Sequence, residues 1–353
     1  MNHHVPGELM IAEIHEQPTA LARLIEKELK RVWQMAEPWA NKPPRFIFIA
    51  ARGTSDHVAL YAKYLIETMN HIPVGLAAPS VSGIYNAHLN VEDALFIGIS
   101  QSGEAADVIS VLEQARRDGA ATLAITNNNT SPITRIADHT IPLHAKPELA
   151  VAATKTFSSS MAALLMLSAA IGRSEKMCAE LERLPSLVAE VIGKENQIDP
   201  KVERFRYLRE CVVLGRGYNL ATAYELSLKM RETSNIRAQP FASPDFVHGP
   251  IAIIEEGYPV IAFANRGLAL PSVLKVITET QARGAEAVVI GNAPDALAIA
   301  DVSFPILPER DIPEWLSPFP SIVAGQLFAH ALAVLKGFDP DKPRGLQKVT
   351  ITR

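Results

Sequence analysis

Cysteine is scarce in this chain of 353 residues, which contains only Cys178 and Cys211. Two cysteines are too few for a disulfide framework and lack metal-site spacing, so we expect a reducing, cytoplasmic compartment. Long apolar runs are also missing. The most apolar helical candidate, at 160–172, is shorter than the roughly 20 residues that a bilayer requires, and the first ten residues lack the pattern of a secretory signal. The sequence therefore predicts no membrane partner.

An excess of basic residues is absent as well, because 34 Lys and Arg stand against 38 Asp and Glu, for a formal net charge of -4. This balance gives no basic surface for nucleic acid, so nucleic acid is not an expected partner. Neither the Gly-x-Gly-x-x-Gly motif nor the P-loop lysine occurs, which disfavours a dinucleotide or a nucleoside triphosphate. No cluster of metal ligands is visible in the sequence. We expect no metal and no cofactor.

What the sequence does contain is an internal repeat. An apolar strand followed by Arg-Gly and an amphipathic helix occurs at 45–67 and again at 211–232. Two further motifs recur in the same order, and the three pairs have offsets of 164, 165 and 163 residues: Gly53 with Gly217, Gly119 with Gly284, and Asp138 with Asp301. A nearly constant offset indicates two duplicated domains.

Each half alternates short, continuous apolar strands with helix-length amphipathic segments. In the first half we predict strands near 45–51, 73–77, 94–100, 121–126 and 138–143, with helices near 55–70, 105–118 and 153–172. This alternation predicts the α/β class: two tandem, doubly wound, flavodoxin-like domains of three αβα layers, each with a parallel sheet of about five strands. The expected order is a helical arm at 1–40, domains at 41–173 and 204–340 joined by a helical linker at 174–203, and a tail at 341–353.

Small polar residues follow one of the predicted strands directly. Ser100, Gln101, Ser102 and Gly103 form the turn into the next helix, where free backbone N–H groups and the helix dipole attract an anion. The segment 52–55, "RGTS", ends the first strand in a similar way. The pattern favours a small phosphate ester, although serine and glycine are also common turn and N-cap residues.

A second group of polar residues lies in the second half. Glu225, Lys229 and Glu232 are spaced i, i+4 and i+7, which places them on one face of a helix. Two carboxylates and an amine suit proton transfer, and ordinary solvated ion pairing explains the same spacing. His248 lies in a predicted loop and Lys348 in the irregular tail; neither is distinctive by itself.

The whole chain resembles the tandem sugar isomerase (SIS) domain portion of glucosamine-6-phosphate synthase, the isomerizing glutamine-fructose-6-phosphate aminotransferase. The motifs that carry the resemblance follow the family order: "MIAEIHEQP" (10–18), "RGTS", "SQSGE", "PELAVAATKTF" (147–157), "LSLKMRETSNI", "VHGPIAI" and "DKPRGLQKVT". Any one of these motifs is weak evidence, but the complete series is specific.

The resemblance implies roles for individual residues. Gly53, Thr54, Ser55, Ser100, Gln101 and Ser102 are expected to hold the sugar phosphate, with Val151 and Gln347 also contacting substrate. Glu232 is expected to move a proton between C1 and C2, His248 to open the ring, and Lys229 and Glu225 to order the site. Lys348 corresponds to the family's Schiff-base lysine. The family also implies a homodimer in which His248 comes from the neighbouring subunit.

Some features depart from the synthase. The sequence starts without the glutamine amidohydrolase domain, Arg52 stands where the synthase usually has Cys, Ala105 replaces a phosphate-contacting Thr, and 78–86 lacks the synthase's charged residues. These differences favour stand-alone members that release ammonia from glucosamine 6-phosphate to give fructose 6-phosphate. The alternatives are the synthase direction, a fructosamine-6-phosphate deglycase, and a non-catalytic sugar-phosphate sensor. A sensor has no need for Glu232, His248 and Lys348 together.

Overall fold

The computed structural model describes residues 5–348, which form two compact units. The first-sheet unit comprises Glu16–Glu148, Lys155–Pro185 and the described residues after Leu346. The second-sheet unit comprises the described residues before Glu16, together with Leu149–Thr154 and Ser186–Leu346. The boundaries predicted for the arm, linker and tail stay predictions, and residues 349–353 of the predicted tail lie outside the described residues.

A parallel sheet of five strands forms the centre of the first-sheet unit, in the order β2-β1-β3-β4-β5. Its strands are β1 (Phe46–Ala50), β2 (Val74–Leu76), β3 (Ala94–Ile99), β4 (Ala121–Thr126) and β5 (His139–Pro142). Every residue of β3 is buried, as expected for a central strand covered on both faces. The strands match the predicted ranges closely, and the predicted flavodoxin-like order is confirmed.

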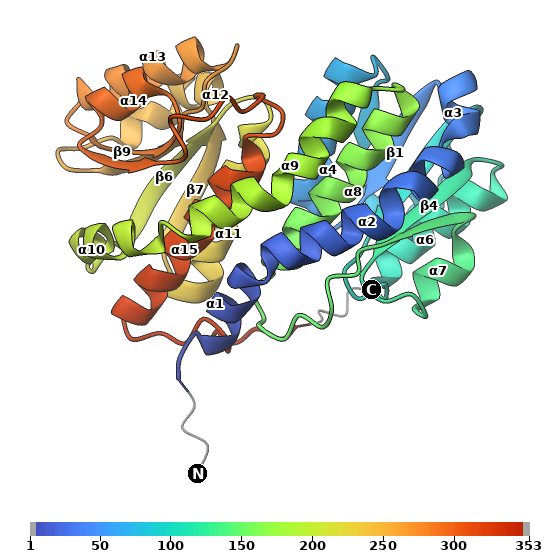
Figure 1. Cartoon of the computed structure of the whole chain (residues 1–353), viewed down its shortest axis with the longest axis horizontal. Coiled ribbons are helices and arrows are strands. Elements are labelled where there is room, and N and C mark those ends of the chain that lie inside the picture. Colours follow the sequence, from blue (N-terminus) through green and yellow to red (C-terminus); the bar gives the residue numbers. More distant parts are fainter. Residues whose placement is uncertain (1–4, 349–353) are drawn as a thin grey trace. The chain divides into compact units, whose positions relative to one another are not determined.

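Helices cover both faces of this sheet (Figure 1). The helices of the unit are α2 (Gln17–Met35), α3 (Glu37–Asn41), α4 (Thr54–Met69), α5 (Pro79–Gly83), α6 (Ala106–Arg117), α7 (Pro132–Ile136), α8 (Lys155–Ile171) and the first part of α9 (Glu175–Ile192). All 17 residues of α8 are buried, and α2 and α4 pack against it. On the opposite face, α6 packs on β3 and β4. The result is the predicted three-layer arrangement.

The second-sheet unit repeats this topology. Its parallel sheet has the order β10-β9-β8-β6-β7, which, read from the β7 end, is the order of the first sheet. The strands are β6 (Glu210–Gly215), β7 (Arg237–Ala242), β8 (Pro259–Phe263), β9 (Glu286–Gly291) and β10 (Val302–Pro305). The helices are α1 (Glu8–His15), the rest of α9, α10 (Asp199–Val202), α11 (Asn219–Ser234), α12 (Ser243–Val247), α13 (Leu270–Gln281), α14 (Pro294–Ile299) and α15 (Pro318–Leu335), with 3-10 turns at Glu195–Gln197, Glu203–Phe205 and Pro250–Ile253.

The duplication extends to individual side chains. A carboxylate oxygen of Asp138 accepts the backbone N–H of Thr122 on β4 at 3.0 Å, and Asp301 accepts that of Ala287 on β9 at 2.8 Å. The paired glycines have nearly equal backbone angles, with φ of +93° at Gly119 and +92° at Gly284. Positions related by the sequence offset are therefore structurally equivalent in these helix-to-strand connections.

The helix α15 is the one segment among residues 5–348 that is long and apolar enough to cross a membrane by length and composition. The protein buries 78% of its apolar window, and a buried core helix passes the same test. The helix α8, which was expected to be the most apolar, is shorter. The absence of a membrane partner stays a prediction.

Candidate active site

The carboxyl ends of β1 and β3 bring the predicted phosphate-binding residues to one edge of the first sheet. The two strands pair in parallel, with Phe46 beside Ala94 and Ala50 beside Gly98. The segment 52–55 follows β1 and the segment 100–103 follows β3. Ligands of doubly wound sheets bind beyond this edge. We call these two segments the phosphate cradle.

The turn after β3 is built by its own hydrogen bonds. The backbone N–H of Gly103 donates to the Ser100 carbonyl and to the Ser100 Oγ, each at 3.1 Å. Gln101 is held in place because its carbonyl accepts the backbone N–H of Asn127 at 3.1 Å. The Oγ of Ser102 accepts the N–H of Glu104 at 3.2 Å. The turn is thus fixed before any ligand arrives.

Gly103 must be glycine for two reasons. Its φ of +70° lies in the left-handed region, where a side chain costs about 1–2 kcal/mol. A Cβ at this position would also lie 2.5 Å from the Cβ of Ser131 and 3.0 Å from the Oγ1 of Thr126, and closer still to the Oγ of Ser131. Glycine therefore lets the turn approach Ser131 and Thr126 closely.

Two helices begin at the cradle. Gly53, with φ of +54°, precedes Thr54 and Ser55, which open α4, and α6 begins at Ala106. Neither helix has a side-chain hydrogen bond from its N-cap residue. Helix N-termini carry unsatisfied N–H groups and partial positive charge, so both ends are oriented to attract an anion.

The charged residues around the cradle have both signs, since Asp56 and Asp107 lie in the first turns of α4 and α6. The guanidinium of Arg52, whose side chain is 55% exposed, pairs with Asp107 on the first turn of α6 at 2.5 Å. Glu104, the residue whose charge conflicts with an anion, is exposed. Arg52 therefore places a cation, itself paired with Asp107, at the rim of the cradle.

The predicted face of α11 carries a buried ion triad. The Nζ of Lys229 lies 3.3 Å from a carboxylate oxygen of Glu225 and 2.7 Å from one of Glu232. The side chains of Lys229 and Glu225 are 1% and 0% exposed, whereas that of Glu232 is 23% exposed. The sequence left solvated ion pairs as an alternative, but the burial of two members excludes it. Glu232 is the one member that solvent, and hence a substrate, can reach.

The charge state of Lys229 follows from its neighbours. Burial lowers the pKa of Lys229, but the negative charges of Glu225 and Glu232 and their hydrogen bonds outweigh it, so the pKa is raised above 10.5. A raised pKa means that the folded state favours the ammonium form of Lys229. The resulting stabilisation is fully present below the ordinary pKa of lysine and is lost only as the pH rises through the higher pKa of the folded state. Lys229 therefore stays cationic at neutral pH, which suits an ordering role rather than that of a base.

Two predicted residues lie in the second-sheet unit without joining the triad. His248 directly follows α12 as its C-cap residue and is exposed, and no hydrogen bond or ion pair links its imidazole to α11 within residues 5–348. The backbone N–H of Val151 contacts the carbonyl of Asp341 at 3.4 Å. Their predicted roles in ring opening and sugar contact stay predictions.

The tail residues lie in the first-sheet unit. Gln347 is exposed, and the Nζ of Lys348 donates to a carboxylate oxygen of Glu148 at 2.9 Å. The side chain of Glu148 is 0% exposed, and it also accepts the N–H and the Oγ1 of Thr156 at 3.1 and 2.7 Å. Glu148 thus stabilises the start of α8 and fixes Lys348 at the same time. The first-sheet unit therefore contains the cradle with Gln347 and Lys348, and the second-sheet unit contains the triad with Val151 and His248.

Sequence reasoning missed Glu148 and Lys155. The Nζ of Lys155, which is 1% exposed, pairs with Glu16 at 2.6 Å and donates to the carbonyl of Pro147 at 2.7 Å. Both residues lie within the family motif at 147–157. Their signal was a pair of opposite charges in an otherwise small and apolar segment, but their partners are far away in the sequence.

Sequence comparison with known proteins finds matches over almost the whole chain. The SIS domain family model matches residues 43–170 and 208–335. The isomerizing glutamine-fructose-6-phosphate aminotransferases of Thermococcus kodakarensis and Thermus thermophilus are 36% and 33% identical to this chain over 96% of it. The chain spans 57% and 58% of their respective lengths.

Solved structures of related proteins have the same fold. The C-terminal domain of the glucosamine-fructose-6-phosphate aminotransferase of Francisella tularensis has a TM-score of 0.85 at 26% identity, covering 95% of this chain and 98% of that one. A protein of Silicibacter pomeroyi, provisionally named a phosphosugar isomerase, has a TM-score of 0.86 at 33% identity, covering 96% and 100%. The glucosamine-6-phosphate deaminase of Thermotoga maritima, at 20% identity and a TM-score of 0.76, covers 98% and 100% and shows the fold alone.

The triad gives a first stability prediction. Replacing Lys229 by Met leaves the buried Glu225 without its cation, which costs about 3–5 kcal/mol of unfolding free energy. The matched control is Lys275→Met on α13, because Lys275 pairs with Glu279 at the same i, i+4 spacing but is 74% exposed; it costs less than about 1 kcal/mol. Denaturant unfolding of both variants measures the difference. Equal losses would contradict the buried triad.

The cradle gives a second prediction. Gly103→Ala combines left-handed strain with overpacking against Ser131, for an expected loss of about 2–5 kcal/mol. Gly119→Ala is the control, because Gly119 also has positive φ but has no atom within 4 Å of its added Cβ; only the strain of about 1–2 kcal/mol remains. Thermal unfolding compares the two, and titration with inorganic phosphate by calorimetry tests the cradle itself. If Gly103→Ala bound phosphate as the wild type does, the cradle assignment would be wrong.

Proposed function

Because the chain belongs to the SIS domain family, we propose that it binds a phosphorylated sugar and isomerises it, with the phosphate in the cradle of the first-sheet unit. The main support for isomerisation is the α11 triad, in which Lys229 and Glu225 are buried and Glu232 alone reaches solvent. Aldose-ketose interconversion moves one proton between adjacent carbons, and a single carboxylate can remove it and return it. Glu232 has the exposure for this role.

We propose further that the substrate is glucosamine 6-phosphate and that ammonia is released. In the open-chain aldehyde, Glu232 takes the proton from C2 while the aldehyde oxygen gains a proton, which gives an enolamine. Glu232 then returns the proton to C1 while the amino group loses one, which gives a C2 imine with a hydroxyl at C1. Water then adds to the imine carbon, the C–N bond breaks, and ammonia leaves fructose 6-phosphate. The departures at Arg52, Ala105 and 78–86 from the synthase pattern support this direction.

A second candidate is the isomerase half of a glutamine-dependent synthase, working from fructose 6-phosphate and ammonia. The relatives at 36% and 33% identity are isomerizing glutamine-fructose-6-phosphate aminotransferases, which favours this candidate. Both candidates use the same cradle and the same proton transfer, so they differ in the direction of the nitrogen chemistry. A non-catalytic sensor needs the cradle but gains nothing from the triad, and the triad therefore argues for an enzyme.

The decisive assay supplies glucosamine 6-phosphate and measures ammonia and fructose 6-phosphate. Glu232→Gln keeps the shape and a hydrogen-bonding oxygen beside Lys229 but cannot accept the proton, so turnover falls about 10²–10⁴-fold while substrate binding is retained. Glu279→Gln on α13, an exposed helical carboxylate, serves as the control and keeps wild-type turnover. A Glu232→Gln variant with normal turnover would remove Glu232 from the mechanism. Synthesis from fructose 6-phosphate and ammonia without deamination would favour the second candidate, and binding without turnover would favour the sensor.

We also propose that the active form is a homodimer in which His248 opens the sugar ring at the neighbour's site. The exposure of His248 and its lack of contact with α11 support a role outside its own unit.

Subunit exchange tests this proposal. When the inactive variants Glu232→Gln and His248→Ala are mixed and exchange subunits, each mixed dimer has one site with both an intact Glu232 and an intact His248. Turnover that reappears in the mixture supports a site shared between subunits. If each site were formed by one chain alone, every site in a mixed dimer would lack either Glu232 or His248. A mixture that stays inactive, although mixed dimers are seen by native mass spectrometry, would contradict it.

A further inference from the structure

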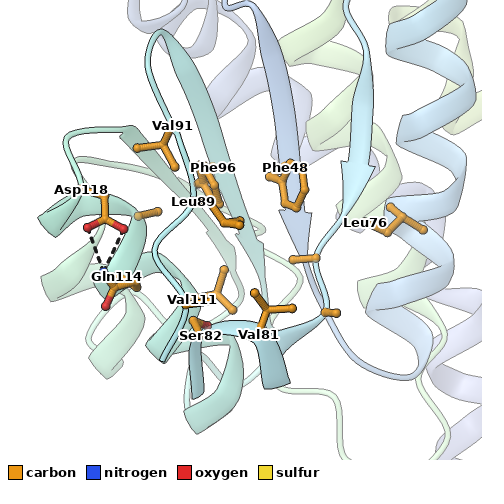
Figure 2. A pocket seen from close by; sticks show the side chains of 14 residues that line it. Phe48, Leu76, Val81, Ser82, Leu89, Val91, Phe96, Val111, Gln114 and Asp118 are labelled. Carbon is orange, nitrogen blue, oxygen red and sulfur yellow. Dashed lines mark hydrogen bonds between the residues drawn. The ribbon is translucent and has the colours of Figure 1, made fainter. Parts of the chain in front are cut away.

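The first-sheet unit contains an apolar cavity of about 250 Å³ that no residue of the phosphate cradle lines. Phe48 of β1 and Phe96 of β3 form its floor, and Val111 of α6 forms part of its wall. Val81 of α5 and Leu89 of the following loop lie over it. Figure 2 shows these side chains gathered around one space on the α6 side of the sheet.

The internal repeat shows how the two units differ at this position. The offset of 164 residues that relates Gly53 to Gly217 also relates Ser82 of α5 to Phe246 of α12. Both short helices directly follow the equivalent edge strands, β2 and β7. Ser82 lines the cavity, whereas Phe246 is 0% exposed and belongs to the apolar core of its unit.

The equivalent region of the second-sheet unit is filled. Phe246 packs against Phe241 with ring centroids 5.3 Å apart, Ile251 belongs to the same core cluster, and Val247 packs against that cluster. An aromatic ring therefore occupies the position that a serine hydroxyl occupies in the first-sheet unit. The first-sheet unit has the same strand order but no ring at Ser82. By the same offset, Phe48 and Phe96 of the cavity floor correspond to Val212 and Val260, so the rings of the first-sheet unit lie on the sheet and the space beside Ser82 stays open.

One edge of the cavity is polar. The amide nitrogen of Gln114 donates to both carboxylate oxygens of Asp118, at 2.9 and 2.8 Å, and the Nδ1 of His88 lies 2.9 Å from one of them. The hydrogen bonds from Gln114 and His88 lower the pKa of Asp118, so that it stays ionised at neutral pH. Figure 2 shows Gln114 and Asp118 together at the edge of the apolar side chains. An ionised carboxylate has about four acceptor positions, so it can accept a further donor.

Size and chemistry together define a ligand. An enclosed apolar cavity of about 150 Å³ binds benzene. This cavity is larger, is partly open to solvent, since its lining residues Leu76 and Leu89 are 37% and 43% exposed, and has a hydrogen-bond acceptor at its edge. We propose that the cavity binds a compact aromatic molecule with a single hydrogen-bond donor, whose ring takes the place that the Phe246 ring fills in the second-sheet unit. This site is separate from the cradle and from the proposed sugar-phosphate chemistry.

Phenol is the probe, since it has one ring and one donor, and toluene is the same ring without the donor. Ligand-observed NMR and thermal unfolding measure binding to the full chain. We expect saturable phenol binding that is at least about tenfold tighter than toluene binding, a difference of about 1.4 kcal/mol. Ser82→Phe restores the ring of the repeat, so phenol affinity falls at least about tenfold and the melting temperature without phenol rises.

Two variants control for other effects of the substitution. Ser82→Ala leaves the space open, so it keeps the wild-type affinity for phenol. Ser80→Phe adds the same ring to the same helix at a residue that does not line the cavity, so it also keeps the wild-type affinity. Should Ser82→Phe fail to fold, Ala115→Met on α6 fills the space from the opposite wall. The absence of saturable phenol binding to the wild type, or equal binding by a folded cavity-filling variant, overturns the site. Equal affinity for toluene and phenol overturns the role of Asp118 as the acceptor for the ligand's hydrogen-bond donor.

Discussion

A buried ammonium that must be neutralised is the constraint on which the candidate site depends. Lys229 is almost fully enclosed and keeps its charge only because two carboxylates of the same helix flank it. A buried charge without a partner is strongly unfavourable, so the helical spacing fixes the positions of all three groups. Glu232, the outermost member, is therefore oriented by an interaction inside the core. The same rule holds at Glu148, whose buried carboxylate fixes Lys348.

The two units use one topology for different purposes. In both, a strand ends at a polar turn from which a helix begins, because a parallel sheet brings the carboxyl ends of its strands to one edge. In the first-sheet unit this edge carries hydroxyls, glycines and helix N-termini, which suit an anion. In the second-sheet unit the helix after the first strand carries the ion triad. Duplication supplied two equal edges, and the side chains at each edge determine the chemistry that it supports.

The sequence predicted most of the framework, because the relevant signals are local. Continuous apolar runs gave the strands of the first sheet, and the recurring motifs gave the second. The i, i+4, i+7 spacing gave the face of α11 but not its burial, since charged residues on a helix are usually solvated. Glu148 and Lys348 are 200 residues apart, so no local pattern connects them. The cavity was equally hidden, because Ser82 becomes informative only when it is compared with the buried Phe246. The position of Val151 depends on Asp341, a contact across most of the chain.

The contacts of Asp341 have a consequence for the order in which the chain can fold. Its carboxylate oxygens accept the backbone N–H groups of Leu9 and Met10 at 2.9 and 2.8 Å, across 332 and 331 residues. The second-sheet unit is thus built from three separate stretches of chain. The helix α1 cannot make these contacts until the segment around Asp341 has also been synthesised, 332 residues after Leu9. Closure over such a distance carries an entropic cost and is slow, so α1 stays open to chaperones and proteases for longer than segments with local partners.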